Sequence, residues 1–121
     1  MANILLAEDD ESLRKFLAQA LVRAGHEVTD FGDGSEAWEC LKGVVAFDLL
    51  LTDIVMPGMD GIEVARLAAQ RHPGLRIMFI TGFAAVALSA GERAPAGAKV
   101  LSKPIHLREI VAEVERMMAA A

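Results

Sequence analysis

Five polar residues of the sequence could together carry out chemistry on a phosphoryl group. Glu8 and Asp9 follow the first apolar run, Asp53 follows the third, and Thr81 and Lys103 follow the fourth and fifth. Three converging carboxylates repel one another unless they share a cation, and oxygen ligands in an incomplete cage favour Mg²⁺. A carboxylate can also act as a nucleophile toward phosphorus, while a lysine and a hydroxyl hold phosphoryl oxygens. We expect Asp53 to be the nucleophile, because it stands alone after a long buried strand and faces the Glu8–Asp9 pair.

The elements that must position these side chains alternate along the chain. Near-continuous apolar runs predict strands buried on both faces, and the segments between them have the apolar periodicity of one-faced helices. This alternation predicts a doubly wound α/β domain, in which ligands bind beyond the carboxyl ends of the strands. The predicted strands are 3–7, 27–31, 47–52, 76–80 and 98–101, and the predicted helices are 13–24, 35–42, 60–73, 83–90 and 107–118.

Short polar residues mark where several of the helices begin and end. Gly25 is placed to end the first helix in a left-handed conformation, and Ser35 could cap the second. Asp60 has the spacing of a capping box for the third helix. Asp10 and Glu11 fit first-turn acids favoured by the helix dipole better than metal ligands.

The remaining notable side chains are predicted to serve packing or to lie at the surface. The three histidines have no metal-binding spacing and are expected at the surface, and the others match apolar helix faces. These residues are His26, His72 and His106, together with Trp38, Cys40, Met117 and Met118.

Length and composition limit the class of protein. The chain has 121 residues, 54% of them hydrophobic, which suits one globular domain spanning 1–121 without an output domain. Twelve basic against seventeen acidic residues give a net charge of −5, which argues against nucleic-acid or anionic-membrane partners. A single cysteine, Cys40, fits a reducing compartment, and the chain lacks a signal-peptide pattern and a long apolar run. We therefore expect a cytoplasmic protein.

The motifs around the polar residues resemble the CheY-like receiver domain of bacterial two-component response regulators. They are ILLAEDD at 4–10, LTDIVMPGMDG at 51–61, TG at 81–82 and SKP at 102–104. Their order and spacing are far more specific than any one of them. The resemblance covers essentially the whole chain and implies a flavodoxin-like parallel sheet of five strands in the order 2-1-3-4-5 with five helices.

The resemblance also implies a role for each site residue. Asp53 would accept a phosphoryl group from the phosphohistidine of a histidine kinase or a histidine phosphotransfer protein. Asp9 would hold Mg²⁺ directly and Glu8 through water, with the backbone carbonyl of Val55 as a further ligand. Thr81 would be the switch hydroxyl, and Lys103 would grip the phosphoryl group from beside a cis peptide bond to Pro104.

The sequence departs from the receiver pattern where signalling is concerned. Val100 occupies the position that usually holds a Tyr or Phe switch residue, and Ile105 replaces a frequent Phe. We expect the helix that starts at Phe83 to move instead. This segment has one polar residue in eight, so it is predicted to be a partner-binding surface formed by Phe83, Ala84, Ala85, Val86, Ala87 and Leu88.

A narrower resemblance concerns stand-alone receivers of alphaproteobacterial cell-cycle control, through FITGFAAVAL at 79–88 and AKVLSKP at 98–104. That family is associated with protein degradation by the ClpXP protease, with the unphosphorylated form active. This makes ClpXP a candidate effector. The final Ala120 and Ala121 could be a tail seized by an unfolding protease or only helix-forming residues.

Three other functions remain open at this point. A Mg²⁺-dependent phosphatase with an aspartyl nucleophile would usually carry a second Asp where this chain has Val55. A chemotaxis-type receiver with a different partner would share every motif. An inert receiver scaffold would not need Thr81 and Lys103. We expect a phosphoacceptor switch with at most slow autodephosphorylation, and not a turnover enzyme.

Overall fold

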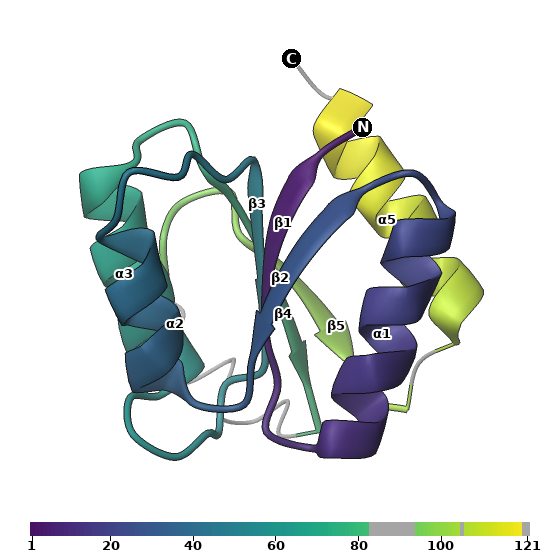
Figure 1. Ribbon diagram of the computed structural model, residues 1–121, viewed down its shortest axis with the longest axis horizontal. Coiled ribbons are helices and arrows are strands. Elements are labelled where there is room, and N and C mark those ends of the chain that lie inside the picture. The colour runs from purple at the N-terminus through teal and green to yellow at the C-terminus, as the bar shows by residue number, and fades with distance from the viewer. Residues whose placement is uncertain (83–93, 105, 120–121) are drawn as a thin grey trace.

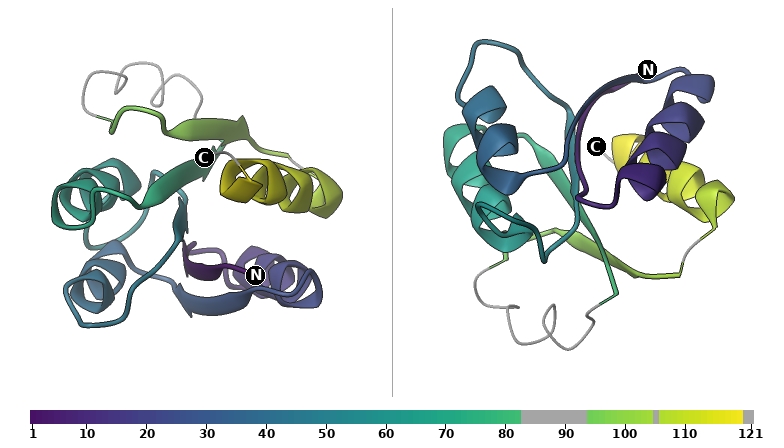
Figure 2. Two further views of the ribbon diagram at one scale, coloured as in Figure 1. Left: turned by 90° about the horizontal axis from the view of Figure 1, so that it is seen from above. Right: turned by 60° about the horizontal axis from the view of Figure 1, so that its bottom comes forward.

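The computed structural model describes residues 1–82, 94–104 and 106–119, and these form three layers (Figures 1 and 2). The central layer is a parallel sheet of five strands in the order β2-β1-β3-β4-β5, as predicted. Helices α1 and α5 cover one face, and α2 and α3 cover the other. The strands are β1 (Asn3–Ala7), β2 (Glu27–Phe31), β3 (Leu49–Thr52), β4 (Arg76–Thr81) and β5 (Lys99–Ser102). The helices are α1 (Glu11–Arg23), α2 (Gly34–Leu41), α3 (Gly61–Arg71) and α5 (Leu107–Ala119).

The number of helices agrees with the prediction only in part. The described residues contain four helices, and the predicted helix at 83–90 lies outside them. Each of these four is within a few residues of its predicted range. None of them is long and apolar enough to cross a membrane.

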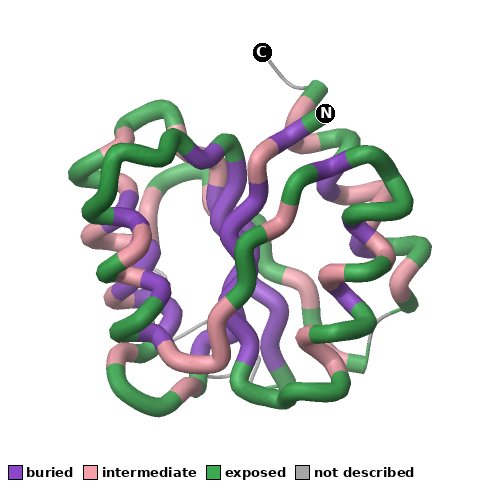
Figure 3. Tube along the Cα trace, viewed as in Figure 1, coloured by how far each residue is buried: buried purple, intermediate pink, exposed green. Residues whose placement is uncertain are grey.

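The apolar runs fill two cores, one on each face of the sheet. Along β1, Ile4 and Leu6 point toward α1 and α5, whereas Leu5 and Ala7 point toward α2 and α3. Successive strand side chains alternate between faces, so a strand covered on both sides must be apolar throughout. Figure 3 shows the central strands buried between helices whose outer faces are exposed.

Helix ends confirm the predicted roles of Gly25 and Asp60 and correct those of Asp10 and Ser35. Gly25 has φ +98° after α1, in the left-handed region where glycine is favoured. The side chain of Asp60 accepts from Glu63 N, as a cap should. Asp10, predicted in the first turn of the first helix, is instead the N-cap of α1, where its side chain accepts from Leu13 N, and Glu11 is the first-turn acid. The cap predicted at Ser35 is instead Asp33, because Asp33 Oδ1 accepts from Ser35 N at 2.7 Å and Glu36 N at 3.2 Å. Helix α2 therefore begins at Gly34.

The prediction that the histidines lie at the surface is wrong for His26. Its Nδ1 is 3.0 Å from Ala2 N and its Nε2 is 2.8 Å from Glu115 Oε1, and the residue is 6% exposed. His26 therefore joins the start of β1 to α5, and a buried imidazole is satisfied by partners far away in the sequence. His72 is half-buried with Nε2 2.8 Å from the Leu41 carbonyl oxygen, whereas His106 is exposed.

Candidate functional site

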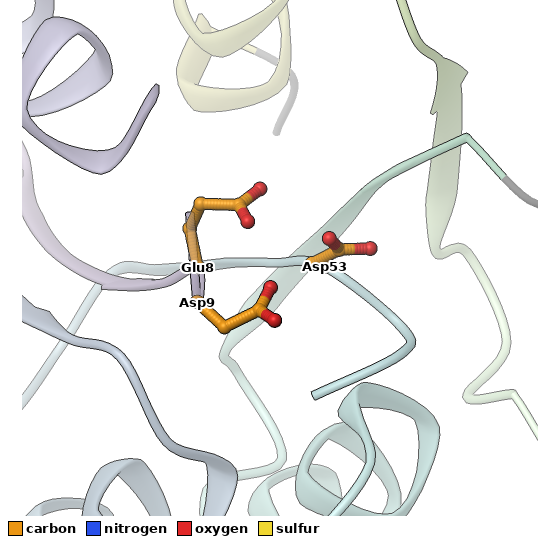
Figure 4. A group of neighbouring side chains, drawn as sticks. All are labelled: Glu8, Asp9 and Asp53. Atoms are coloured by element: carbon orange, nitrogen blue, oxygen red, sulfur yellow. The ribbon is translucent and has the colours of Figure 1, made fainter. Parts of the chain in front are cut away.

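The predicted site residues lie at the carboxyl ends of four strands. Glu8 and Asp9 follow β1, Asp53 follows β3, Thr81 ends β4, and Lys103 follows β5. Because β1 and β3 are neighbours in the parallel sheet, their ends bring the acidic residues together. One carboxylate oxygen from each of Glu8, Asp9 and Asp53 lies within 4.8 Å of the others, and Figure 4 shows the three carboxylates side by side.

Glu8 is the most buried acid of this cluster, at 1% exposure. Its Oε2 accepts from Asp10 N at 3.0 Å. Its Oε1 lies 2.9 Å from Lys103 Nζ as an ion pair, but has no well-directed hydrogen bond among the described residues. Burial raises the pKa of the Glu8 carboxyl, and the negative charge of Asp53 adds to this, whereas the hydrogen bond from Asp10 N and the nearby Lys103 ammonium oppose it.

Asp53 is held rigidly at the end of β3 and is 6% exposed. Its Oδ1 accepts from Ile54 N at 2.7 Å, and its Oδ2 accepts from Lys103 Nζ at 2.9 Å. Its backbone N donates to the Ala7 carbonyl at 2.9 Å, which continues the β1–β3 ladder into the site. The carboxylate is therefore fixed in direction while facing the other two acids.

Lys103 directly follows β5, the edge strand on the other side of β4 from β3, and its side chain extends toward the acids. Its backbone N donates to the Thr81 carbonyl at 2.8 Å, and the peptide bond to Pro104 is cis, as the resemblance implied. Burial lowers the pKa of the Lys103 ammonium, but its contacts with Asp53 and Glu8 outweigh this and raise the pKa overall. Lys103 is thus held in its charged form between two carboxylates.

Thr81 and Val55 complete the predicted set. Thr81 is fully buried at the end of β4, opposite Ser102 of β5. Val55 lies in the segment that follows Asp53, with 48% of the residue exposed. The roles of the Thr81 hydroxyl and the Val55 carbonyl remain predictions.

Close backbone approaches hold the segment between β3 and α3. Gly61 N donates to the Ile54 carbonyl at 2.7 Å, and a Cβ on Gly61 would lie 1.8 Å from the Asp53 carbonyl oxygen. A Cβ on Gly34 would lie 1.7 Å from the Met59 carbonyl oxygen. The chain after Asp53 is therefore packed against the starts of both α2 and α3, at distances that only glycine permits.

The acidic cluster fits a hard divalent cation. All of its side-chain ligand atoms are carboxylate oxygens, which Mg²⁺ prefers, and a Mg²⁺ ion bound by so few protein ligands usually keeps several waters. Glu8 Oε1 is compatible with this fit: it pairs with Lys103 Nζ at 2.9 Å but has no well-directed hydrogen bond among the described residues, so it can still accept from a water on a bound cation. Glu8, Asp9 and Asp53 would hold the ion.

Sequence reasoning missed Arg14. Its Nη1 donates to the Glu8 carbonyl oxygen at 2.8 Å and its Nε donates to Asp30 Oδ2 at 3.1 Å. One signal was available, because Arg14 lies in the first turn of α1, where the helix dipole disfavours a cation. The predicted partner surface at Phe83–Leu88 and the residues Ile105, Ala120 and Ala121 lie outside the described residues.

The parallel sheet with an acidic cluster at the carboxyl ends of its strands defines a receiver-type regulatory domain, and comparison with known proteins shows the family. The model of the response regulator receiver domain family matches residues 4–115, so the chain belongs to that family. It is 60% identical to the response regulator receiver protein CpdR of Brucella abortus over 121 residues, which are 100% of both chains.

Two further comparisons concern a longer protein that contains a similar segment and a solved structure with a similar fold. The DNA-binding transcriptional regulator NtrC of Azospirillum brasilense is 37% identical over 97% of this chain, but the match covers only 24% of that protein. The crystal structure of a response regulator receiver protein from Sinorhizobium medicae has a TM-score of 0.90 at 33% identity, covering 98% of this chain and 94% of that one. The chain is thus similar both to a receiver of its own length and to receivers within longer proteins.

Proposed function

We propose that this protein is a single-domain response regulator whose protein binding is switched by phosphorylation of Asp53. The observation that carries the proposal is the bridge by Lys103 Nζ, 2.9 Å from both Asp53 Oδ2 and Glu8 Oε1, within a cluster of three carboxylates. Packing alone does not require an ammonium and two nearly buried acids at the carboxyl ends of neighbouring strands. A site that binds Mg²⁺ and a phosphoryl group needs both kinds of charge.

In the proposed reaction, a carboxylate oxygen of Asp53 attacks the phosphorus of a phosphohistidine. The new O–P bond forms as the N–P bond breaks, and the imidazole nitrogen keeps the electron pair and leaves. Bound Mg²⁺ would neutralise charge on the phosphoryl oxygens. The donor is a histidine kinase or a histidine phosphotransfer protein, as the family implies.

The residues of the chain position the nucleophile and hold the product. The bond from Ile54 N orients the Asp53 carboxylate, and Lys103 Nζ is near enough to pair with a phosphoryl oxygen on Asp53. We assign to the Thr81 hydroxyl a hydrogen bond to a second phosphoryl oxygen, and to the Val55 carbonyl a ligand position on the ion. These groups store a phosphoryl group and do not turn over a substrate, so only slow autodephosphorylation is expected.

The output of the switch is a change in protein binding. Identity to CpdR along the full length supports a role in ClpXP-dependent proteolysis during the cell cycle, which the narrower resemblance implied. We propose Phe83–Leu88 as the partner surface, with the helix beginning at Phe83 replacing the aromatic switch absent at Val100. Val100 itself is 42% exposed on β5.

The test is labelling by a small-molecule phosphodonor, followed by intact-mass spectrometry. Wild type should gain one phosphoryl group when Mg²⁺ is present and none when the metal is chelated. Asp53→Ala should fold and remain unlabelled, and persistent labelling of this variant would overturn the site. Affinity capture with wild type, Asp53→Ala and beryllofluoride-treated protein then identifies the effector and the state that it prefers, with purified ClpXP as the direct candidate.

A further inference from the structure

We propose that Arg14 is a positioning residue that fixes the peptide group between Glu8 and Asp9, and thereby aims Asp9 at the cation. This inference rests on the proposed Mg²⁺ site and deepens it. Arg14 touches neither the ion nor the phosphoryl group in this proposal. It acts through the backbone that carries the two acids.

Two hydrogen bonds place the guanidinium of Arg14. Nη1 donates to the Glu8 carbonyl oxygen at 2.8 Å, and Nε donates to Asp30 Oδ2 at 3.1 Å. The Arg14 side chain is 19% exposed, against 42% for that of Asp30. A Cβ on Gly32 would lie 2.6 Å from Nη1, so the absence of a side chain there leaves room for the guanidinium. Arg14 is therefore clamped between the end of β2 and the segment after β1.

Asp9 depends on this clamp because its carboxylate has no anchor of its own. Within residues 1–82, 94–104 and 106–119 the structure gives the Asp9 side chain no hydrogen bond and no ion pair, and the residue is exposed. Glu8, in contrast, is fixed by its N donating to the Phe31 carbonyl at 3.0 Å and by its own carboxylate. The Glu8 carbonyl oxygen belongs to the peptide group that sets the direction of Asp9, and Arg14 holds that oxygen.

The positioning effect and the charge effect of Arg14 have opposite signs. A guanidinium near a cation site repels the cation, so charge alone predicts that removing it strengthens Mg²⁺ binding. Positioning predicts weaker binding, because Asp9 loses its fixed direction. Loss of an outer-shell partner weakens metal binding by about 10-fold or more. The direction of the change therefore distinguishes the two roles.

The experiment is calorimetric titration of Mg²⁺ into the unphosphorylated protein, which needs no phosphodonor. We expect Arg14→Ala to weaken binding about 10-fold. Lys15→Ala is the matched control, because Lys15 is the next residue of α1, is 68% exposed and pairs only with Glu11 at the surface among the described contacts. It should leave the affinity unchanged or slightly higher. If Arg14→Ala binds Mg²⁺ as tightly as Lys15→Ala, the inference is wrong.

A second pair of variants keeps the test decisive if Arg14→Ala fails to fold. Asp30→Ala removes the acceptor that holds Nε, and Glu11→Ala removes the same charge from an exposed position on α1. Asp30→Ala should weaken Mg²⁺ binding about 3-fold more than Glu11→Ala does, a smaller effect than loss of the whole outer-shell partner. Equal affinities for the two variants would overturn the inference. Failure of the wild type to bind Mg²⁺ would instead refute the proposed function.

Discussion

Lys103 and Asp53, fifty residues apart in the chain, are joined by a 2.9 Å hydrogen bond from Nζ to Oδ2. The same nitrogen lies 2.9 Å from Glu8 Oε1, so one ammonium partly neutralises two acids at the end of the sheet. A divalent cation bound to the same three carboxylates would neutralise more of their negative charge. Lys103 and a cation bound there would therefore have overlapping electrostatic roles.

We predict that Lys103→Met destabilises the metal-free protein and that Mg²⁺ restores most of the loss. Two carboxylates lose their counter-charge, which should lower the free energy of unfolding by about 1–2 kcal/mol for a partly exposed pair. Mg²⁺ binds only the folded site and should stabilise the variant by mass action. Urea unfolding with and without Mg²⁺ measures both effects. The control is Lys99→Met, since Lys99 pairs with Glu113 at 4.0 Å away from the site. An equal loss in both variants, unaffected by Mg²⁺, would contradict the prediction.

We predict that the affinity for Mg²⁺ falls as the pH is lowered, starting above the range where ordinary carboxylates titrate. Burial raises the pKa of Glu8, so protons compete with the cation for its carboxylate at a higher pH than usual. Glu8→Gln should bind Mg²⁺ more weakly at neutral pH and lose this part of the pH dependence. Titrations of both proteins across a pH series give the measurement. An unchanged pH profile in Glu8→Gln would show that another group is responsible.

We predict that Gly61→Ala is strongly destabilising, whereas Gly74→Ala is tolerated. A methyl group on Gly61 would lie 1.8 Å from the Asp53 carbonyl oxygen, so the backbone beside the phosphoacceptor must move. Such overpacking costs about 1–3 kcal/mol. A methyl group on Gly74 meets nothing within 4 Å. Chemical denaturation ranks the two variants. Similar stabilities would show that the Gly61 turn relaxes easily, and the rate of Asp53 labelling should fall only in Gly61→Ala.

The features that the sequence predicted correctly are those set by residues close together in the chain. The near-continuous apolar run at 47–52 predicted a strand buried on both faces, and Asp53 directly after it, together with the polar residues after the other strands, predicted the site. The closeness of Asp53 and Lys103 was expected from the fold class, because the carboxyl ends of parallel strands lie at the same end of the sheet. The cap at Asp33 was missed because Ser35 is an equally good capping type two residues later.

Other features could not be predicted because long-range packing decides them. Only its unfavourable place in the first turn of α1 sets Arg14 apart in the sequence, and its contact with the Glu8 carbonyl oxygen is one that only the folded chain brings about. His26 follows a glycine and precedes a strand, which is typical of an exposed turn. In the folded chain its ring is buried, and Nε2 lies 2.8 Å from Oε1 of Glu115, 89 residues away.

We predict that His26→Leu weakens the attachment of α5 to the rest of the domain. Because Ala2 N–H donates to Nδ1, the ring hydrogen lies on Nε2 and is donated to Glu115. Leucine fills the space but leaves the buried Ala2 N–H without an acceptor, at a cost of about 1–3 kcal/mol. The free energy of unfolding should fall by this amount, and amide exchange in α5 should become faster. His106→Leu, at an exposed position before α5, is the matched control and should change neither quantity. If His26→Leu is as stable as the wild type, the two hydrogen bonds of His26 contribute no net stability, and apolar packing alone holds α5 in place.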